Sequence, residues 1–220
     1  MLADLDSLLE QLIHIPGSSS EQVNEYLHPV DRDKVKYLVQ EIDDLRARSC
    51  PTGLSAKEKR SWTSNNNRDI GLKYEEAIRA LFENSEVLSA SASQRTVIGE
   101  IDVVFTFLTL APKVPLLQGH TTGLGEAKCH QTNLKSEWVT EMSGNFAHHS
   151  VRFGIIFPFC SPKKLGVDTI QALKEAYLLK TSIIPFGRGQ FNRVLAGESF
   201  LKVLAEQDSL AKTGVKSLEI

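Results

Sequence analysis

The sequence predicts an α/β protein in which a mixed central sheet is flanked by helices and preceded by a small helical region. Three observations predict this class. Apolar residues recur at helical spacing through the first 60 of the 220 residues. After residue 68, helix-like and strand-like patterns alternate in the order α-β-β-β-α-β-α-β. The strand-like segments are dense in Val, Ile, Phe and Thr, which favour extended structure.

The first 60 residues predict three helices. The first carries apolar residues at helical spacing from Leu2 to Ile13 and ends at Pro16-Gly17. The second follows three serines, runs from about residue 21 to residue 27, and stops near a proline. Asp31 or Asp33 can cap the third helix. Its apolar face consists of Val35, Leu38, Val39, Ile42 and Leu45.

A polar stretch over residues 50–67 predicts a linker or surface loop. We therefore expect a helical N-terminal region over 1–60 that reads DNA or mediates dimerisation, a main domain over 66–200, and a C-terminal tail over 201–220.

The main domain carries the alternating pattern. Its first helix is expected over about 70–84, with its apolar face formed by Ile70, Tyr74, Ala77, Ile78, Leu81 and Phe82. The expected strands cover residues 87–96, 97–110, 124–129, 152–159 and 181–186, and further helices cover about 133–147 and 166–180.

Composition and charge narrow the classes of protein. No run of about 18 apolar residues predicts a membrane span, and the N-terminus lacks the pattern of a secretory signal. Three widely spaced cysteines suggest neither a disulfide framework nor a zinc motif, so we expect a cytoplasmic protein. The net charge is -2, but residues 128–193 hold 9 bases and 4 acids, which is a local excess that can hold phosphates.

Two of the predicted strands carry residues that could take part in catalysis. Side chains alternate along a strand, so Glu126 and Lys128 point to the same face while the small residues between them face the other way. Asp102 stands at the head of a run that looks buried, where a carboxylate destabilises the fold unless something pairs with it. A magnesium ion bound by Asp102 and Glu126 would pair with it, because Mg²⁺ prefers oxygen ligands.

This arrangement resembles the PD-(D/E)XK nuclease superfamily. Asp102 matches its Asp, and Glu126 with Lys128 matches its (D/E)-x-K. The segments Gly71-Leu72-Lys73-Tyr74-Glu75 and Gly99-Glu100-Ile101-Asp102 resemble motifs of the Mrr-like restriction endonucleases, as does Met142-Ser143-Gly144 with the following Arg152-Phe153-Gly154-Ile155-Ile156. The resemblance covers about residues 68–190 and implies a restriction-endonuclease-like core.

The sequence also departs from the family. Ile101 stands where the superfamily name has Pro, many Mrr-like members carry Gln where this chain has Glu126, and the loop over 109–123 is long. Residues 1–60 resemble no family.

The resemblance implies a homodimeric Mg²⁺-dependent endonuclease of double-stranded DNA, with Mn²⁺ as a possible substitute, acting in restriction or phage defence. It implies that Asp102, Glu126, Lys128 and Glu75 are catalytic, with Glu76 as the near alternative to Glu75. It implies that the metal is held by Asp102, Glu126 and Ala127. The expected DNA contacts are His130, Gln131, Lys135, Lys163, Lys164, Arg188 and Arg193.

Two alternatives stay open. One is another nuclease of the same fold, namely a junction-resolving enzyme, a repair enzyme or a nuclease of RNA. The other is a non-catalytic DNA-binding or assembly module that kept the fold. Other conspicuous residues are expected to be structural: His148 and His149 as solvated or capping residues, His120 as an inert loop residue, and Cys129 and Cys160 as small buried residues. Residues 187–190 are expected to form a flexible basic turn.

Overall fold

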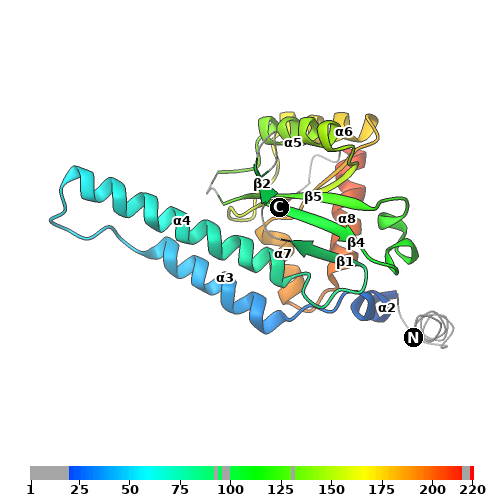
Figure 1. Cartoon of the computed structure of the whole chain (residues 1–220), viewed down its shortest axis with the longest axis horizontal. Helices are drawn as coiled ribbons and strands as arrows, with labels where there is room; N and C mark the ends of the chain where they lie inside the picture. Colours follow the sequence, from blue (N-terminus) through cyan, green and yellow to red (C-terminus); the bar gives the residue numbers. More distant parts are fainter. Residues whose placement is uncertain (1–19, 92–93, 96–99, 130–131, 215–218) are drawn as a thin grey trace.

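The structure is a computed structural model that describes residues 20–91, 94–95, 100–129, 132–214 and 219–220. The helix expected over 2–13 lies outside these residues. A five-stranded sheet with the order β1-β4-β5-β6-β7 forms the centre, and Figure 1 shows α5 and α6 together on one side of it. Within the described residues, no helix combines the length and apolar composition needed to span a bilayer.

The sheet is mixed because its two halves are connected differently. β1 (Leu88–Ser91), β4 (Val103–Phe107) and β5 (Thr122–Lys128) form an antiparallel meander. β6 (Phe153–Pro158) and β7 (Ser182–Pro185) are parallel to β5, because α5 and α6 lie between successive strands in the chain. A mixed sheet with flanking helices was the fold class expected from the sequence, and it is confirmed at that level.

One face of the sheet packs against the first helices of the chain. These are α2 (Ser20–Leu27), α3 (Arg32–Ala47) and α4 (Ala56–Ala80). The apolar face predicted for α3 is confirmed, since all five of its residues are buried, and Asp31 caps the helix by accepting the N–H of Lys34. α7 (Arg188–Leu195) and the start of α8 (Phe200–Thr213) complete this core.

The opposite face packs against α5 (Ser136–His149) and α6 (Val167–Leu178). Two glycines in the sheet permit close approaches. A Cβ at Gly154 would lie 2.3 Å from the ring of Phe146 on α5, and one at Gly125 would lie 2.9 Å from the side chain of Val103. Glycine at these positions therefore lets α5 pack closely on β6, and lets the side chains of β4 pack closely on β5.

Smaller elements connect these layers. A short ribbon pairs β2 (Gln94–Arg95) with β3 (Glu100–Ile101). Two 3₁₀ turns, Ala111–Lys113 and Pro115–Leu117, fill the loop between β4 and β5.

Three expectations about the fold are wrong. Residues 56–67 are not a linker but the first half of α4, which runs through the expected boundary between the N-terminal region and the main domain. Residues 201–220 are not a tail, because α8 buries Phe200, Leu201, Val203 and Leu204 in the core. Residues 187–190 are not a flexible turn, because α7 begins at Arg188 and buries Phe191 and Val194.

Candidate active site at the carboxyl end of β5

The side chains of β5 alternate between the two faces of the sheet, as predicted. Leu124 belongs to the apolar cluster beneath α5 and α6. Ala127 and Cys129 pack against the core formed with α3 and α4, on the other face. Since side chains alternate, Glu126 and Lys128 lie on the α5 side with Leu124.

A bend brings Asp102 to this strand. The long strand expected over 97–110 is interrupted at Asp102, which lies between β3 and β4. Its Oδ2 accepts a 2.8 Å hydrogen bond from the backbone N–H of Ala127. This bond fixes the carboxylate beside the Glu126-Ala127-Lys128 segment.

Two carboxylates therefore act on one another at the end of β5. Burial raises the pKa of Glu126, and the negative charge of Asp102 raises it further. The hydrogen bond from Lys128 opposes this rise in the pKa but does not cancel it.

Lys128 is the cation within reach. Its side chain is 15% exposed, and its Nζ lies 2.7 Å from Oε1 of Glu126 and 3.9 Å from Oε2 of Glu141. The same Nζ lies 5.6 Å from the ring centroid of Trp138. Trp138 and Glu141 belong to α5 and were not anticipated from the sequence. Their spacing of three residues on one helix face was the available signal.

The donor set suits Mg²⁺ better than a transition metal. Two carboxylates and the backbone carbonyl of Ala127 offer hard oxygen atoms, and Mg²⁺ commonly takes only one or two carboxylates, with water completing its shell. Among the residues that the structure describes, no three His, Cys, Asp or Glu side chains come together as metal ligands. A metal here would therefore have a sparse protein shell, and a bound cation would favour the ionised form of Glu126, whose pKa is raised.

The fourth predicted catalytic carboxylate is that of Glu75. Glu75 raises the pKa of the Cys129 thiol, and the Cys129 side chain leaves β5 on the face opposite Glu126. Its near alternative, Glu76, is 3.1 Å from Nζ of Lys73 on the same helix. Of the four predicted catalytic residues, three meet at the end of β5, and Glu75 is placed beside Cys129.

Cys129 is held as a structural residue. Arg46 donates hydrogen bonds to the backbone carbonyl oxygens of Cys129 and Phe159 at 3.0 Å and 2.7 Å. Burial raises the pKa of the thiols of Cys129 and Cys160. Both are therefore poor nucleophiles, as expected from the sequence.

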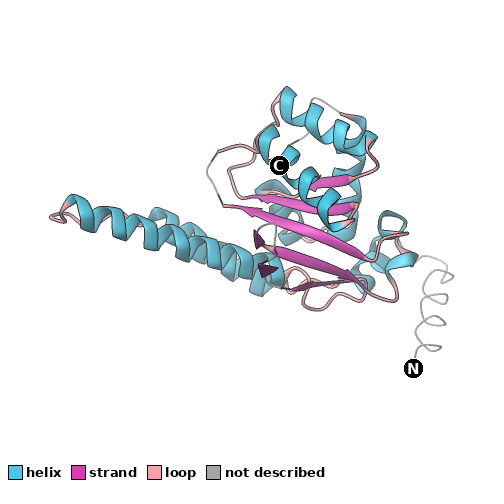
Figure 2. Cartoon of the chain, turned by 45° about the horizontal axis from the view of Figure 1, so that its top comes forward, coloured by secondary structure: helices cyan, strands magenta, loops and turns pink. Residues whose placement is uncertain are grey.

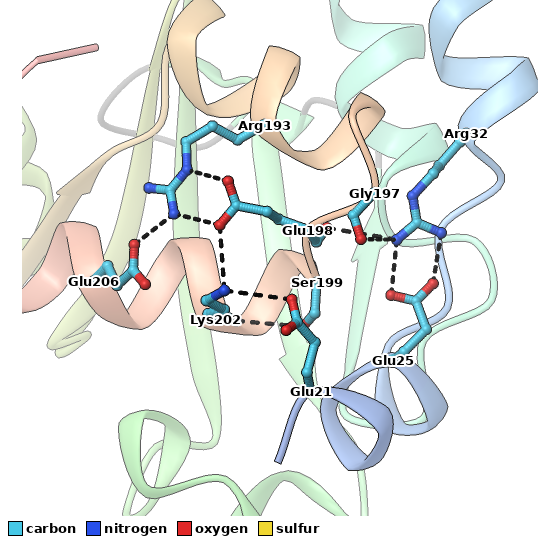
Figure 3. Close-up of polar contacts among 9 residues, drawn as sticks. All are labelled: Glu21, Glu25, Arg32, Arg193, Gly197, Glu198, Ser199, Lys202 and Glu206. Atoms are coloured by element: carbon cyan, nitrogen blue, oxygen red, sulfur yellow. Dashed lines mark hydrogen bonds and ion pairs between the residues drawn. The ribbon is translucent and has the colours of Figure 1, made fainter. Parts of the chain in front are cut away.

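Two of the predicted DNA contacts are paired with acidic side chains in this fold. Arg188 forms two hydrogen bonds with the carboxylate of Asp43, at 2.7 Å and 3.1 Å. Arg193 bonds the carboxylates of Glu198 and Glu206, each at 2.6 Å, in the network drawn in Figure 3. Both guanidinium groups are neutralised by acids and serve to hold helices together.

The other predicted contacts have different outcomes. Lys135, Lys163 and Lys164 are exposed, and Nζ of Lys135 lies 5.7 Å from the ring centroid of Trp138. His130 and Gln131 fall outside the described residues.

A hollow of about 580 Å³ lies by the start of β5, on the same face of the sheet as Glu126. Ile101 and Leu124 line it, one residue before Asp102 and two before Glu126. Its polar wall includes His120, His149 and Arg152. Burial lowers the pKa of His120, which also packs against the rings of Phe107 and Phe153.

Comparisons of the chain with family models, with curated proteins and with solved structures found no match.

Proposed function

We propose that the chain is a Mg²⁺-dependent nuclease that hydrolyses phosphodiester bonds of double-stranded DNA. One observation carries the proposal. The carboxylates of Asp102 and Glu126 meet beside Lys128 at the end of a central strand, in surroundings that raise the pKa of Glu126. A carboxylate pair with a neighbouring lysine has the composition needed for hydrolysis of a phosphate diester. The resemblance of these residues to the PD-(D/E)XK superfamily, with its restriction-endonuclease-like core, supports the same function.

Each residue has a role in this proposal. Asp102, held by the N–H of Ala127, and Glu126 would bind the metal together with the carbonyl oxygen of Ala127. When bound, Mg²⁺ supplies a water of lowered pKa and neutralises charge on the phosphate. Lys128 would leave Glu126 and donate hydrogen bonds to the phosphate oxygens, whose charge grows in the transition state. Trp138 and Glu141 would keep its ammonium group at this position.

Two features of the context follow from the proposal. Cutting both strands requires two sites, so we propose that two copies act together as a homodimer. A cytoplasmic role in restriction or phage defence is proposed from the family resemblance alone.

Plasmid cleavage in the presence of Mg²⁺ tests the function. We expect cleavage by the wild type, inhibition by EDTA, and a loss of about 10²–10³-fold or more in Asp102→Ala and Lys128→Ala, because a transition-state contact is removed. The matched controls are Glu175→Ala and Lys174→Ala, exposed residues on α6, and both should cleave like the wild type. Circular dichroism checks that each variant is folded.

The outcomes separate the alternatives. Equal cleavage by the Asp102 and Lys128 variants would overturn the site. DNA binding without cleavage by the wild type would favour a non-catalytic binding module, for which the closed ion pair between Glu126 and Lys128 is the supporting contact. A preference for branched DNA or for RNA over linear duplex would assign the site to a resolving, repair or RNA-directed enzyme.

A further inference from the structure

The first half of α4 projects from the rest of the molecule. Figures 1 and 2 show this helix extending well beyond the sheet, with the preceding segment running out to its tip. We call residues 48–69 the α4 arm. Between Ser55 and Asp69 every residue is exposed except Trp62 and Asn66, which are half-buried. The first buried residue of the helix is Ile70.

The arm is held by local bonds rather than by packing. The N–H of Ser55 donates to Oε2 of Glu58 at 2.8 Å, and Oγ of Ser55 accepts the N–H of Glu58 at 3.4 Å, which together form a capping box. The amide of Asn66 donates to the carbonyl oxygen of Leu45 at 3.2 Å. Residues 63–67 are Thr, Ser and Asn, which are weak helix formers. Residues 56–60 are strong helix formers, so the weaker stretch at 63–67 depends on the helix on either side of it and on the bond from Asn66.

Charge is segregated around the arm helix. Successive residues turn by about 100°, so Lys57, Arg60 and Arg68 share one side with two serines, Ser61 and Ser64. Within the arm, the two acids lie on another side, a quarter turn or more from Lys57: Glu58 and Asp69. We call the first side the basic stripe.

The basic stripe is available to a partner. Lys57, Arg60 and Arg68 are all exposed. Arg68 has only a loose 4.0 Å contact with Asp69. Within the described part of the chain, neither Lys57 nor Arg60 has an acidic partner within ion-pair distance. This contrasts with Arg188 and Arg193, whose charges are neutralised.

The basic stripe leads along α4 toward the carboxyl end of β5, on the face of the sheet opposite Glu126. Continuing at helical spacing from Arg68, the same side of α4 carries Gly71 and then Glu75. Just before them, the carbonyl oxygen of Ile70 lies 3.9 Å from Sγ of Cys129, the residue after β5. The span from Lys57 to Arg68 is about 16 Å at 1.5 Å per residue, which is about half a turn of a DNA duplex.

We propose that the α4 arm binds the phosphate backbone of a DNA duplex through its basic stripe and directs the duplex toward the carboxyl end of β5. The inference rests on the proposed function for its choice of DNA. Three exposed cations with hydroxyl donors between them complement a row of phosphates. A second copy of the chain fits less well, because the arm offers no apolar stripe for a helix–helix seam.

Binding of a labelled 20-base-pair duplex by the full chain, measured by fluorescence anisotropy in EDTA between 50 and 200 mM KCl, tests the proposal. The test variant is Lys57→Gln/Arg60→Gln/Arg68→Gln. We expect its affinity at the lowest salt to fall about tenfold or more, and the slope of log K against log[KCl] to fall by about 2 to 3, because each lost phosphate contact removes about 0.9.

Two further variants control for charge and folding. Lys36→Gln/Lys174→Gln/Lys180→Gln removes the same charge from exposed positions outside the arm and should bind like the wild type. Lys57→Arg/Arg60→Lys/Arg68→Lys keeps the charge of the stripe and should retain the salt slope. Circular dichroism at 222 nm confirms that the arm stays helical in all three.

The outcomes distinguish this proposal from the nuclease proposal. Cleavage by the wild type with an unchanged salt slope in the test variant would overturn the role of the arm alone. Arm-dependent binding without cleavage would overturn the nuclease alone. Wild-type binding absent at 50 mM KCl, an equal loss in the Lys36/Lys174/Lys180 control, or tighter binding of single-stranded RNA than of duplex would each overturn the assignment of the arm to duplex DNA.

Discussion

Two charged clusters in this molecule differ in how well their charges balance. In the corner where α2, α7 and α8 meet, Arg193 bonds Glu198 and Glu206, while Lys202 lies 3.4 Å from Glu21 and 3.5 Å from Glu198 (Figure 3). The bonds from Arg193 lower the pKa of Glu198 to about 2. At the end of β5, burial and a neighbouring carboxylate instead raise the pKa of Glu126.

The difference distinguishes a cluster whose ion pairs stabilise the fold from one in which a buried carboxyl group has a raised pKa. A carboxyl group with a lowered pKa stabilises the folded state in its ionised form. A carboxyl group with a raised pKa is ionised at the expense of stability, which is common where a site must receive a cation or do chemistry. The three predictions below test this contrast.

The largest expected effect comes from His28, which packs against the start of α8 in this corner. Its ring stacks on Phe200 with centroids 4.4 Å apart, its Nε2 lies 2.8 Å from the carbonyl oxygen of Leu81, and its Nδ1 lies 2.6 Å from the hydroxyl of Ser85. Burial lowers the pKa of His28 to about 3. The unfolded chain therefore binds this proton below about pH 6.5 and the folded chain does not, so the stabilisation is complete above pH 6.5 and is lost as the pH falls toward 3.

Urea unfolding between pH 7 and pH 4.5 measures this loss. Each pH unit below 6.5 should remove about 1.4 kcal/mol of the free energy of unfolding. His28→Asn should be less stable at pH 7 and lack this part of the slope. His148→Asn, at an exposed position on α5, should keep it. A wild-type stability that is flat from pH 6.5 to 4.5 would show that the corner tolerates a charged His28.

The next effect is stabilisation by Mg²⁺ at the end of β5. A ligand that binds only the folded state at 100 times its Kd adds about 2.7 kcal/mol, which is a rise in Tm of about 5–10 °C for a chain of this size. We expect this rise in the wild type and not in Asp102→Asn. Glu198→Gln, which alters the balanced corner, should respond to Mg²⁺ like the wild type. An equal rise in Asp102→Asn would place the cation elsewhere.

The smallest effect tests the corner itself. Because the pKa of Glu198 is lowered, its stabilisation is present above about pH 4.5 and is lost as the pH falls toward 2. Its side chain is 32% exposed, so Glu198→Gln should lower the free energy of unfolding by no more than about 1 kcal/mol at pH 7. The difference in Tm between the variant and the wild type should vanish near pH 2. A difference that persists there would assign the loss to packing rather than to charge.

The sequence predicted the structure correctly where the spacing of apolar residues shows which face of an element is buried. The apolar face of α3 and the two faces of β5 follow directly from spacings of 3.6 and 2 residues. The α4 arm escaped this reasoning because it buries almost nothing and so has no apolar period. Its available signal was the capping pair of Ser55 and Glu58, which marks the start of a helix in polar sequence.

The candidate site was accessible from the sequence only in part. Alternation places Glu126 beside Lys128, but the approach of Asp102 depends on a bend and on the pairing of β4 with β5. The pairing of Arg188 with Asp43 joins residues 145 positions apart. Local sequence carries no information on such a contact, so Arg188 was expected to be free for DNA.

The corner also joins the two ends of the described chain. The guanidinium of Arg32 donates to the carbonyl oxygen of Val194, 162 positions later, and Lys202 reaches back to Glu21. Contacts of such high sequence separation form only after a long loop has closed, which slows folding. While α8 has not yet emerged from the ribosome, His28 and the apolar side chains around it would be uncovered. The corner therefore cannot form until α8 is available to pack against α2.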